Sequence, residues 1–262
     1  MAEISVCLLD ADNGGVLEFD GGERVHKTAS IGKILLLIEV AIRLADGRLR
    51  ATIPLRRTAE DDIADSGLLQ HLSATEWSPA DLAVLVGGVS DNLATNVLLR
   101  HVGIPSVIER AKTLELQHTA LLDRVRASRG PSDPPALSVG TAAELADLMA
   151  RLHRGEVRSR AVSRQVLGWL ALDTDTSMTA GAFGLDPLCH FEPDRGISLA
   201  HKTGTDTGIR CDVGVVTGPK RSVAYGVLAS FTESADPSAG ERDEVLGAMF
   251  GIGERIRKLI TD

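Results

Sequence analysis

The sequence has few aromatic residues and no excess of positive charge. Phe, Trp and Tyr make up 3% of the 262 residues, too few for the stacking platforms on which proteins bind single-stranded nucleic acids. The formal net charge at pH 7 is -8, which argues against a basic surface for nucleic acids or a polybasic membrane patch. We therefore expect neither kind of partner.

Cysteines and metal-binding patterns are also scarce. Cys7, Cys189 and Cys211 are an odd number of cysteines without C-x-x-C spacing, so a complete disulfide framework is excluded and no zinc signature appears. The seven histidines do not form the H-E-x-x-H pattern. We expect no metal ion and no other cofactor.

The sequence predicts no membrane span and no signal peptide. The apolar run at residues 34–50, "ILLLIEVAIRLADGRLR", is short and is interrupted by Glu39, Arg43 and Asp46. The first residues, "MAEISVCLLDADNGG", have no basic segment and reach a turn before any long apolar region. As given, the sequence predicts a cytoplasmic protein.

The order of elements predicts an α+β fold. Residues 4–20 form a hairpin around a D-N-G-G turn, a helix begins at Ser30, and no good strand follows until the 190s. Three strand-like runs at 197–205, 210–218 and 222–231 precede a last amphipathic helix. Because a lone hairpin is marginal in water, both ends must share one antiparallel sheet. We expect a single domain with an α/β lobe from residues 1–47 and 186–262 and a helical lobe from 48–185, with a ligand cleft between them.

The first candidate motif is the S-x-x-K pair formed by Ser30 and Lys33 at the start of the apolar helix. A serine hydroxyl becomes a good nucleophile when a base takes its proton, and burial lowers the pKa of a lysine. The N–H groups at the helix start could also bind a developing oxyanion. On spacing alone, a helix-capping serine beside a lysine that reaches for solvent is by far the more common explanation of such a pair.

The second motif is Ser90-Asp91-Asn92, between two helices. All three residue types are common helix caps, which is the simple interpretation. The functional interpretation makes Ser90 a proton relay and Asn92 a donor to a substrate carbonyl, while Asp91 holds the turn.

The third motif is Lys202-Thr203-Gly204, on a late strand. A surface lysine on an edge strand is the simple interpretation. In the functional one, Lys202 and Thr203 bind an anionic substrate group, and Gly204 lets the substrate approach the strand backbone. The N–H of Thr205 would complete an oxyanion hole with that of Ser30, and Arg210 could bind a carboxylate in bidentate fashion.

Taken in order, the segments "TASIGK", "SDNLATNVLL" and "HKTGTDTGIRCDVGVV" closely resemble the class A β-lactamases and their penicillin-recognising relatives. The segment "SGLLQHL" is similar as well. The resemblance implies that Ser30 is acylated, that Lys33, Ser90 and Lys202 assist, and that the substrate is a small β-lactam, peptide or ester. Members of this family are often exported.

One family motif is missing. Class A enzymes carry E-x-x-L-N in the loop after the S-D-N helices, and its glutamate and asparagine hold the water that hydrolyses the acyl-enzyme. Here no glutamate stands between Glu115 and Glu144, and Asp133 is the one carboxylate in the middle of the loop. The resemblance therefore implies either a serine hydrolase with slow deacylation, for which Asp133 is the possible base, or a penicillin-binding or ligand-sensing protein without turnover.

Overall fold

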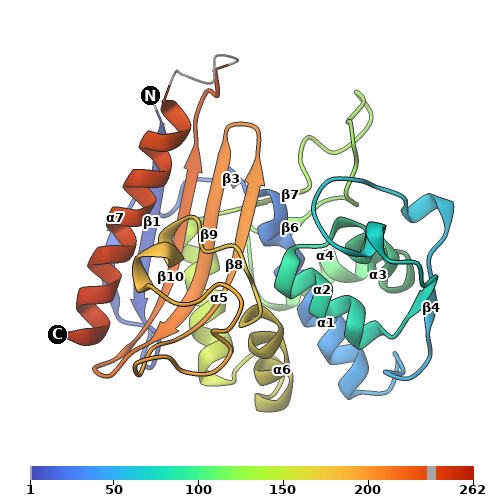
Figure 1. The fold of residues 1–262 in the computed structure, drawn as a ribbon, viewed down its shortest axis with the longest axis horizontal. Helices are drawn as coiled ribbons and strands as arrows, with labels where there is room; N and C mark the ends of the chain where they lie inside the picture. Colours follow the sequence, from blue (N-terminus) through green and yellow to red (C-terminus); the bar gives the residue numbers. More distant parts are fainter. Residues whose placement is uncertain (1, 235–239) are drawn as a thin grey trace.

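A five-stranded antiparallel sheet forms one side of the molecule in this computed structural model, which describes residues 2–234 and 240–262 (Figure 1). The strand order is β2-β1-β10-β9-β8. The strands are β1 (Glu3–Asp10), β2 (Val16–Asp20), β8 (Ser198–Asp206), β9 (Ile209–Thr217) and β10 (Ser222–Ser230). β1 pairs with β10, so both ends of the chain share one sheet, as the sequence predicts.

Helices cover both faces of this sheet, which is why β9 and β10 are buried along nearly their whole length. The 3-10 helix η4 (Thr179–Phe183) and α7 (Glu241–Thr261) pack on one face, where Phe183, Tyr225 and Met249 share an apolar core. α5 (Ala142–Arg154) packs on the other face, against β1, β9 and β10 (Figure 1). α5 belongs to the segment 48–185 that the sequence assigns to a helical lobe, yet it lies directly on the sheet.

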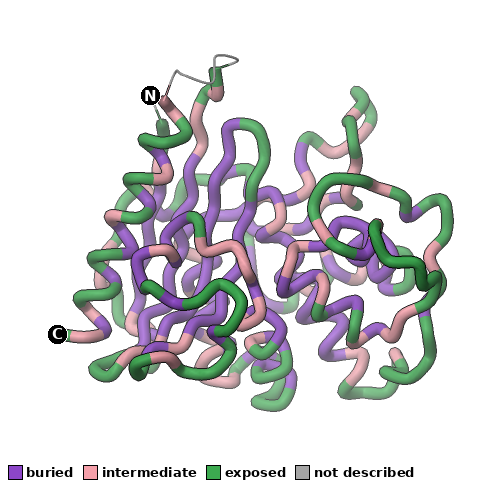
Figure 2. Tube along the Cα trace, viewed as in Figure 1, coloured by how far each residue is buried: buried purple, intermediate pink, exposed green. Residues whose placement is uncertain are grey.

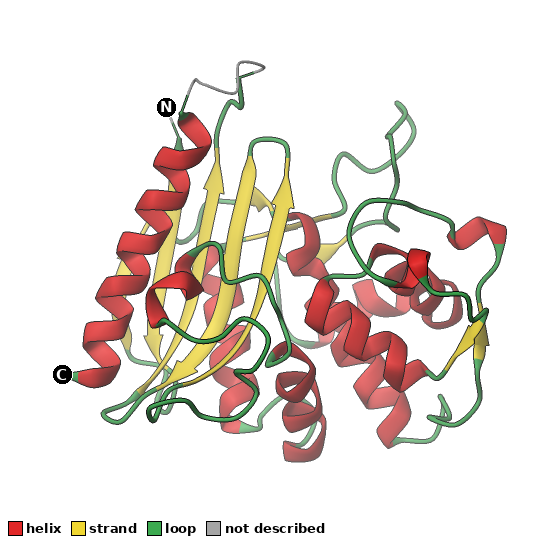
Figure 3. Cartoon of the chain, in the orientation of Figure 1, coloured by secondary structure: helices red, strands yellow, loops and turns green. Residues whose placement is uncertain are grey.

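α1 (Lys33–Ala45) is the central helix of the second half of the molecule, and every residue from Lys33 to Ile42 is buried (Figure 2). It contacts the surrounding helices α2 (Pro79–Val89), α3 (Asn92–Val102), α4 (Ile104–Thr113) and α6 (Arg160–Leu170). Its apolar neighbours join the core under α5, so one continuous apolar cluster runs from the sheet into the helices. Antiparallel sheet and helices together confirm the predicted α+β class (Figure 3).

Short strands also occur between the helix at Ser30 and the 190s, where the sequence predicts none. A three-stranded sheet with the order β3-β7-β6 joins β3 (His26–Lys27), β7 (Ser138–Gly140) and β6 (Ala120–Leu121), and β4 (Leu55–Arg56) pairs with β5 (Glu76–Trp77). That expectation was wrong because strands of two or three residues are too short to show an alternating pattern. Within the described residues, no helix is long and apolar enough to cross a membrane.

Candidate active site

Ser30 lies in a 3-10 turn, η1 (Ala29–Gly32), directly before α1. As the second residue of this turn, Ser30 has a backbone N–H with no acceptor inside the helix. Ala29 before it has a φ of 47°, a strained conformation for a residue with a side chain. Ser138 of β7 holds this turn, because its hydroxyl donates to Ala29 O at 2.6 Å. The helix predicted to begin at Ser30 thus begins as a 3-10 turn, and α1 itself starts at Lys33.

Lys33 is fully buried, and its amine is held by the S-D-N turn. Lys33 Nζ donates to Ser90 O at 2.7 Å, to Ser90 Oγ at 3.2 Å and to Asn92 Oδ1 at 2.8 Å. Burial lowers the pKa of Lys33 well below its usual value, and the charge of Lys202 lowers it further, against the opposing charges of Asp91 and Asp173. A lysine in this setting loses its proton more easily than a solvent-exposed one, which is what a general base requires.

The S-D-N turn joins α2 to α3. Ser90 has a φ of 52°, a left-handed conformation that breaks the helix and turns its side chain to Lys33. Asp91 is buried and caps α3, since it accepts from Ala94 N at 2.8 Å and from Leu69 N at 2.7 Å. Asp91 therefore holds the turn and also fixes the preceding loop. Asn92 is the first residue of α3, and its Nδ2 donates to Ala64 O at 3.4 Å.

The K-T-G residues lie on β8, the edge strand nearest the helices. Lys202 is fully buried, and its amine contacts Asp173 Oδ2 at 3.3 Å and Thr203 O at 3.1 Å. Gly204 packs against η1, and a Cβ there would stand 2.4 Å from Thr28 O. The glycine is thus required by the close approach of β8 to the turn that carries Ser30. From the sequence alone, we expected it to make room for the substrate.

Two cavities meet at Ser30. The smaller has a volume of about 130 Å³, and its wall includes Ser30, Ser90, Thr203 and Thr205. The other, of about 380 Å³, includes Ser30, Asn92 and Thr205. Ser30 and Thr205 line both cavities, so the two residues predicted to supply the oxyanion-hole N–H groups border the same space.

Arg210 lines neither cavity, although it stands directly across from Thr205 on the neighbouring strand β9 and its charge interacts with that of Asp175. Its guanidinium donates to Asp206 O at 2.8 Å and to Ile209 O at 2.7 Å, the carbonyls of its own β8–β9 turn. It also lies over the ring of Phe231, 5.8 Å from the centroid, and 3.9 Å from a carboxylate oxygen of Glu233. These contacts hold Arg210 at the end of the sheet, and its predicted contact with a substrate carboxylate stays a prediction.

Asp133 is also placed away from both cavities. Its Oδ2 accepts from Gly130 N at 2.8 Å, and its Oδ1 lies 3.4 Å from Arg126. The loop residues in the wall of the 380 Å³ cavity are instead Val125, Arg126, Ala127, Arg129 and Leu137. Among the described residues, this loop contributes two arginines and no carboxylate to the wall of the 380 Å³ cavity.

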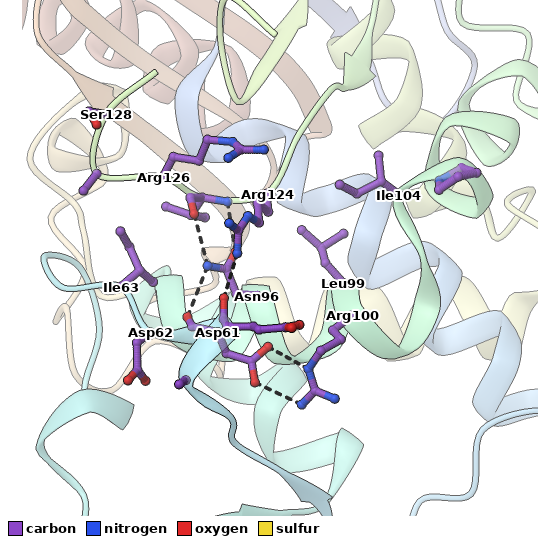
Figure 4. A pocket seen from close by; sticks show the side chains of 15 residues that line it. Asp61, Asp62, Ile63, Asn96, Leu99, Arg100, Ile104, Arg124, Arg126 and Ser128 are labelled. Carbon is purple, nitrogen blue, oxygen red and sulfur yellow. Dashed lines mark hydrogen bonds and ion pairs between the residues drawn. The ribbon is translucent and has the colours of Figure 1, made fainter. Parts of the chain in front are cut away.

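A larger cavity of about 800 Å³ lies beside the 380 Å³ cavity, and Ile63 and residues 125–127 line both. Asn96 holds the loop here, because its Oδ1 accepts from Val125 N at 2.9 Å and its Nδ2 donates to Val125 O at 3.1 Å. Asp61 pairs with Arg100 through two bonds of 2.9 and 3.0 Å (Figure 4). These contacts fix the start of the loop on α3.

Several residues of the site carry no sequence motif. Asp173 and Asp175 come from the segment after α6 and line the 130 Å³ cavity, as does Ser66. Asp65 lines the 380 Å³ cavity. Ser138 supports η1 from a strand too short to predict. Their positions depend on long-range packing, and the pair of aspartates in "LDTDTS" is the one local signal that could have been noticed.

An antiparallel sheet beside a helical region, with a serine and two buried lysines between them, is the arrangement of the serine β-lactamases and penicillin-binding proteins. The chain belongs to the beta-lactamase enzyme family, whose model matches residues 1–258. A β-lactamase of Kitasatospora aureofaciens is 28% identical over 255 residues, which cover 94% of this chain and 78% of the relative. The predicted family is therefore confirmed.

Solved structures support the same fold. A β-lactamase from Sphaerobacter thermophilus superposes with a TM-score of 0.82 at 24% identity, covering 99% of this chain and 93% of that one. PBP-A, in an acyl-enzyme complex of one variant with penicillin G, superposes with a TM-score of 0.80 at 20% identity, covering 98% and 90%. At these identities the likeness shows the fold.

Proposed function

We propose that this protein is a serine hydrolase that is acylated at Ser30 by a β-lactam or a related amide or ester, and that it releases the acyl group slowly. One observation carries the proposal. Ser30 and Ser90 line the same cavity, and the amine of Lys33 is hydrogen bonded to Ser90 Oγ at 3.2 Å.

Acylation follows from these groups. Lys33 in its neutral form takes the proton of Ser30, and the Ser30 oxygen attacks the substrate carbonyl carbon. The N–H groups of Ser30 and Thr205 stabilise the negative oxygen of the tetrahedral intermediate. When that intermediate collapses, the bond to the leaving nitrogen or oxygen breaks, and Ser90 passes a proton from Lys33 to the leaving group.

Deacylation lacks an evident base in the loop. Water attacks an acyl-ester efficiently only when a base holds and deprotonates it, which is worth about 10²–10⁴-fold in rate. Arg126 and Arg129 line the cavity on the loop side, and a guanidinium does not accept a proton in proteins. Lys33 or Ser90 would then have to serve a second time, which supports slow release.

A binding or sensing protein without turnover is the second candidate, and the same loop favours it. The two candidates share acylation and differ in the fate of the acyl-enzyme.

The test combines intact mass and turnover. Incubation with benzylpenicillin should add one ligand mass to the protein, on the peptide that contains Ser30, and Ser30→Ala should remove it. With a chromogenic cephalosporin, a stoichiometric burst followed by slow release supports the hydrolase, and a burst with no later release supports the non-turnover protein. An adduct that persists in Ser30→Ala contradicts both.

A further inference from the structure

The 130 Å³ cavity beside Ser30 is acidic on the side of β8. Its wall contains the side chains of Thr203 and Thr205, as the K-T-G motif predicts, but also Asp173 and Asp175. Within the described residues, no arginine or lysine is among those that line this cavity. The groups expected to bind a substrate anion are therefore accompanied by two carboxylates.

Asp175 is partly buried and is held in its charged form. Burial on its own would raise the pKa of Asp175, but hydrogen bonds from the hydroxyl and amide of Ser177 and from the side chain of Thr203 hold it below its usual value. Both Ser177 donors bind Oδ1, at 2.6 and 3.1 Å. Neither of these two donors uses Oδ2.

The positive charge of Lys202 is partly offset by Asp173, although it still helps to lower the pKa of Asp175. Its amine lies 3.3 Å from Asp173 Oδ2, and both side chains are buried. The same oxygen accepts from Thr203 N at 3.1 Å. Thr203 thus interacts with Asp173 through its backbone N–H and with Asp175 through its side chain. Its hydroxyl already donates toward a negative charge.

Arg210 does not line this cavity, and its guanidinium is bound by the carbonyls of the β8–β9 turn and faces Glu233. The charges of Lys202 and Arg210 still act on Asp175, but both cations are already held by oxygen acceptors of the protein. A carboxylate placed against Thr203 would meet Asp175 and would have to compete with those acceptors for the two cations.

We infer that Asp175 is a substrate-binding residue that selects neutral or cationic groups, and disfavours carboxylates, next to the scissile bond of the substrate. This inference rests on the proposed acylation of Ser30 and names the substrate class for it. The favoured substrates are amides or esters whose group beside the reacting carbonyl is uncharged or carries an ammonium that Asp175 can bind.

Three matched ligands test this: benzylpenicillin, its neutral carboxamide, and its carboxamide with an added aminoethyl group. The second-order rate constant for acylation is measured by intact mass for the wild type and for Asp175→Asn. The ratio of variant to wild type cancels the different intrinsic reactivities of the three ligands. We expect this ratio to rise by about fivefold to tenfold for benzylpenicillin, to fall by a similar factor for the ammonium ligand, and to stay within about twofold for the neutral one.

Asp243→Asn is the matched control, because it removes the same charge from an exposed position on α7 that lines neither cavity at Ser30. It should leave all three ratios near one. If Asp175→Asn fails to fold, the salt dependence of the wild-type acylation rate tests the inference instead. Added salt should speed acylation by the anionic ligand and slow acylation by the cationic one. Equal ratios for the three ligands would overturn the selection by Asp175. So would the lack of opposite salt effects on the anionic and cationic ligands. In either case the acylation of Ser30 would stand. Failure of all three ligands to label Ser30 would overturn the proposed function itself.

Discussion

The amine of Lys33 donates a 3.2 Å hydrogen bond to the hydroxyl of Ser90, a residue 57 positions further along the chain. The lysine is fixed by the start of α1, and the serine is fixed by the left-handed turn between α2 and α3. Because Lys33 is buried and has three acceptors, its position is set before any substrate arrives. In the proposed mechanism, acylation therefore depends on how easily this one amine loses a proton.

We expect acylation to rise with pH and to depend on Lys33. The pKa of Lys33 is lowered first by burial and then by Lys202, so the neutral, basic form gains population as pH rises through that lowered pKa. Lys33→Ala should slow acylation by about 10²–10⁴-fold. Lys33→Arg is the matched control, since it keeps the charge but cannot act as a base. The measurement is the acylation rate with benzylpenicillin from about pH 5 to 9, where a flat profile in the wild type would contradict the role of Lys33.

Asp91 is expected to stabilise the site and the fold together. It is buried, caps α3 through Ala94 N and binds Leu69 N in the preceding loop. Asp91→Ala removes the cap and leaves a buried N–H without a partner, so the free energy of unfolding should fall by about 2–4 kcal/mol. Asp91→Asn keeps one acceptor oxygen and should lose less. Urea denaturation measures both, and equal stability of Asp91→Ala and the wild type would show that the turn does not need this carboxylate.

The meeting of the three motifs could be predicted from the order of the elements that carry them. Ser30 and Lys33 stand at the start of an apolar helix, Ser90 stands between two helices, and Lys202 lies on a late strand that must join the N-terminal hairpin. A sheet built from both ends of the chain leaves few other ways to arrange them. The structure brings Ser30, Ser90, Thr203 and Thr205 to one cavity.

The rest of the site depends on contacts that no local pattern records. Arg210 stands close to Lys202 in sequence, but nearby carbonyls of the β8–β9 turn bind its guanidinium. Asp173 and Asp175 follow α6, and only the packing of that helix beside β8 puts them near Ser30. Asp133 has the right charge for a base, yet the tight turn at Gly130 uses its carboxylate.

The buried pair of His201 and Asp212 is expected to give stability that disappears at higher pH. His201 Nδ1 lies 3.0 Å from Asp212 Oδ1, and both side chains are fully buried. Burial lowers the pKa of His201, but the charge and hydrogen bond of Asp212 outweigh it and raise the pKa above the usual value of 6.5. The raised pKa means that the folded state binds the proton more tightly. The added stability is complete below about pH 6.5 and is lost as pH rises through the folded-state pKa.

Comparison with His201→Gln isolates this effect. The difference in the free energy of unfolding between the wild type and the variant, measured by urea denaturation, should be largest at low pH and should shrink above about pH 6.5. The variant keeps a polar side chain, so the two proteins differ chiefly in the titrating group. A difference that grows as pH rises would show that His201 folds in its neutral form.

A carboxylate added to the loop should speed deacylation. Ala127 is exposed and lines the 380 Å³ cavity together with Ser30 and Asn92, so a glutamate at this position can reach water beside an acyl group on Ser30. Unlike Arg126, Ala127 makes no side-chain ion pair that the change would break. Ala127→Glu supplies the base that the loop lacks, and general-base help of this kind is worth up to about 10²–10⁴-fold. Because the added side chain is flexible and not held by partners, we expect about a tenfold gain, which is below the usual range of that effect.

Ala127→Gln separates the base from the added bulk, since glutamine has the same shape and cannot deprotonate water near neutral pH. The lifetime of the acyl-enzyme is followed by intact mass after removal of excess benzylpenicillin. We expect it to shorten in Ala127→Glu, more so as pH rises above the pKa of the new carboxyl, and to stay near the wild-type value in Ala127→Gln. A wild type that already turns over rapidly, with both variants unchanged, would mean that Lys33 or Ser90 deacylates Ser30 efficiently without any loop base.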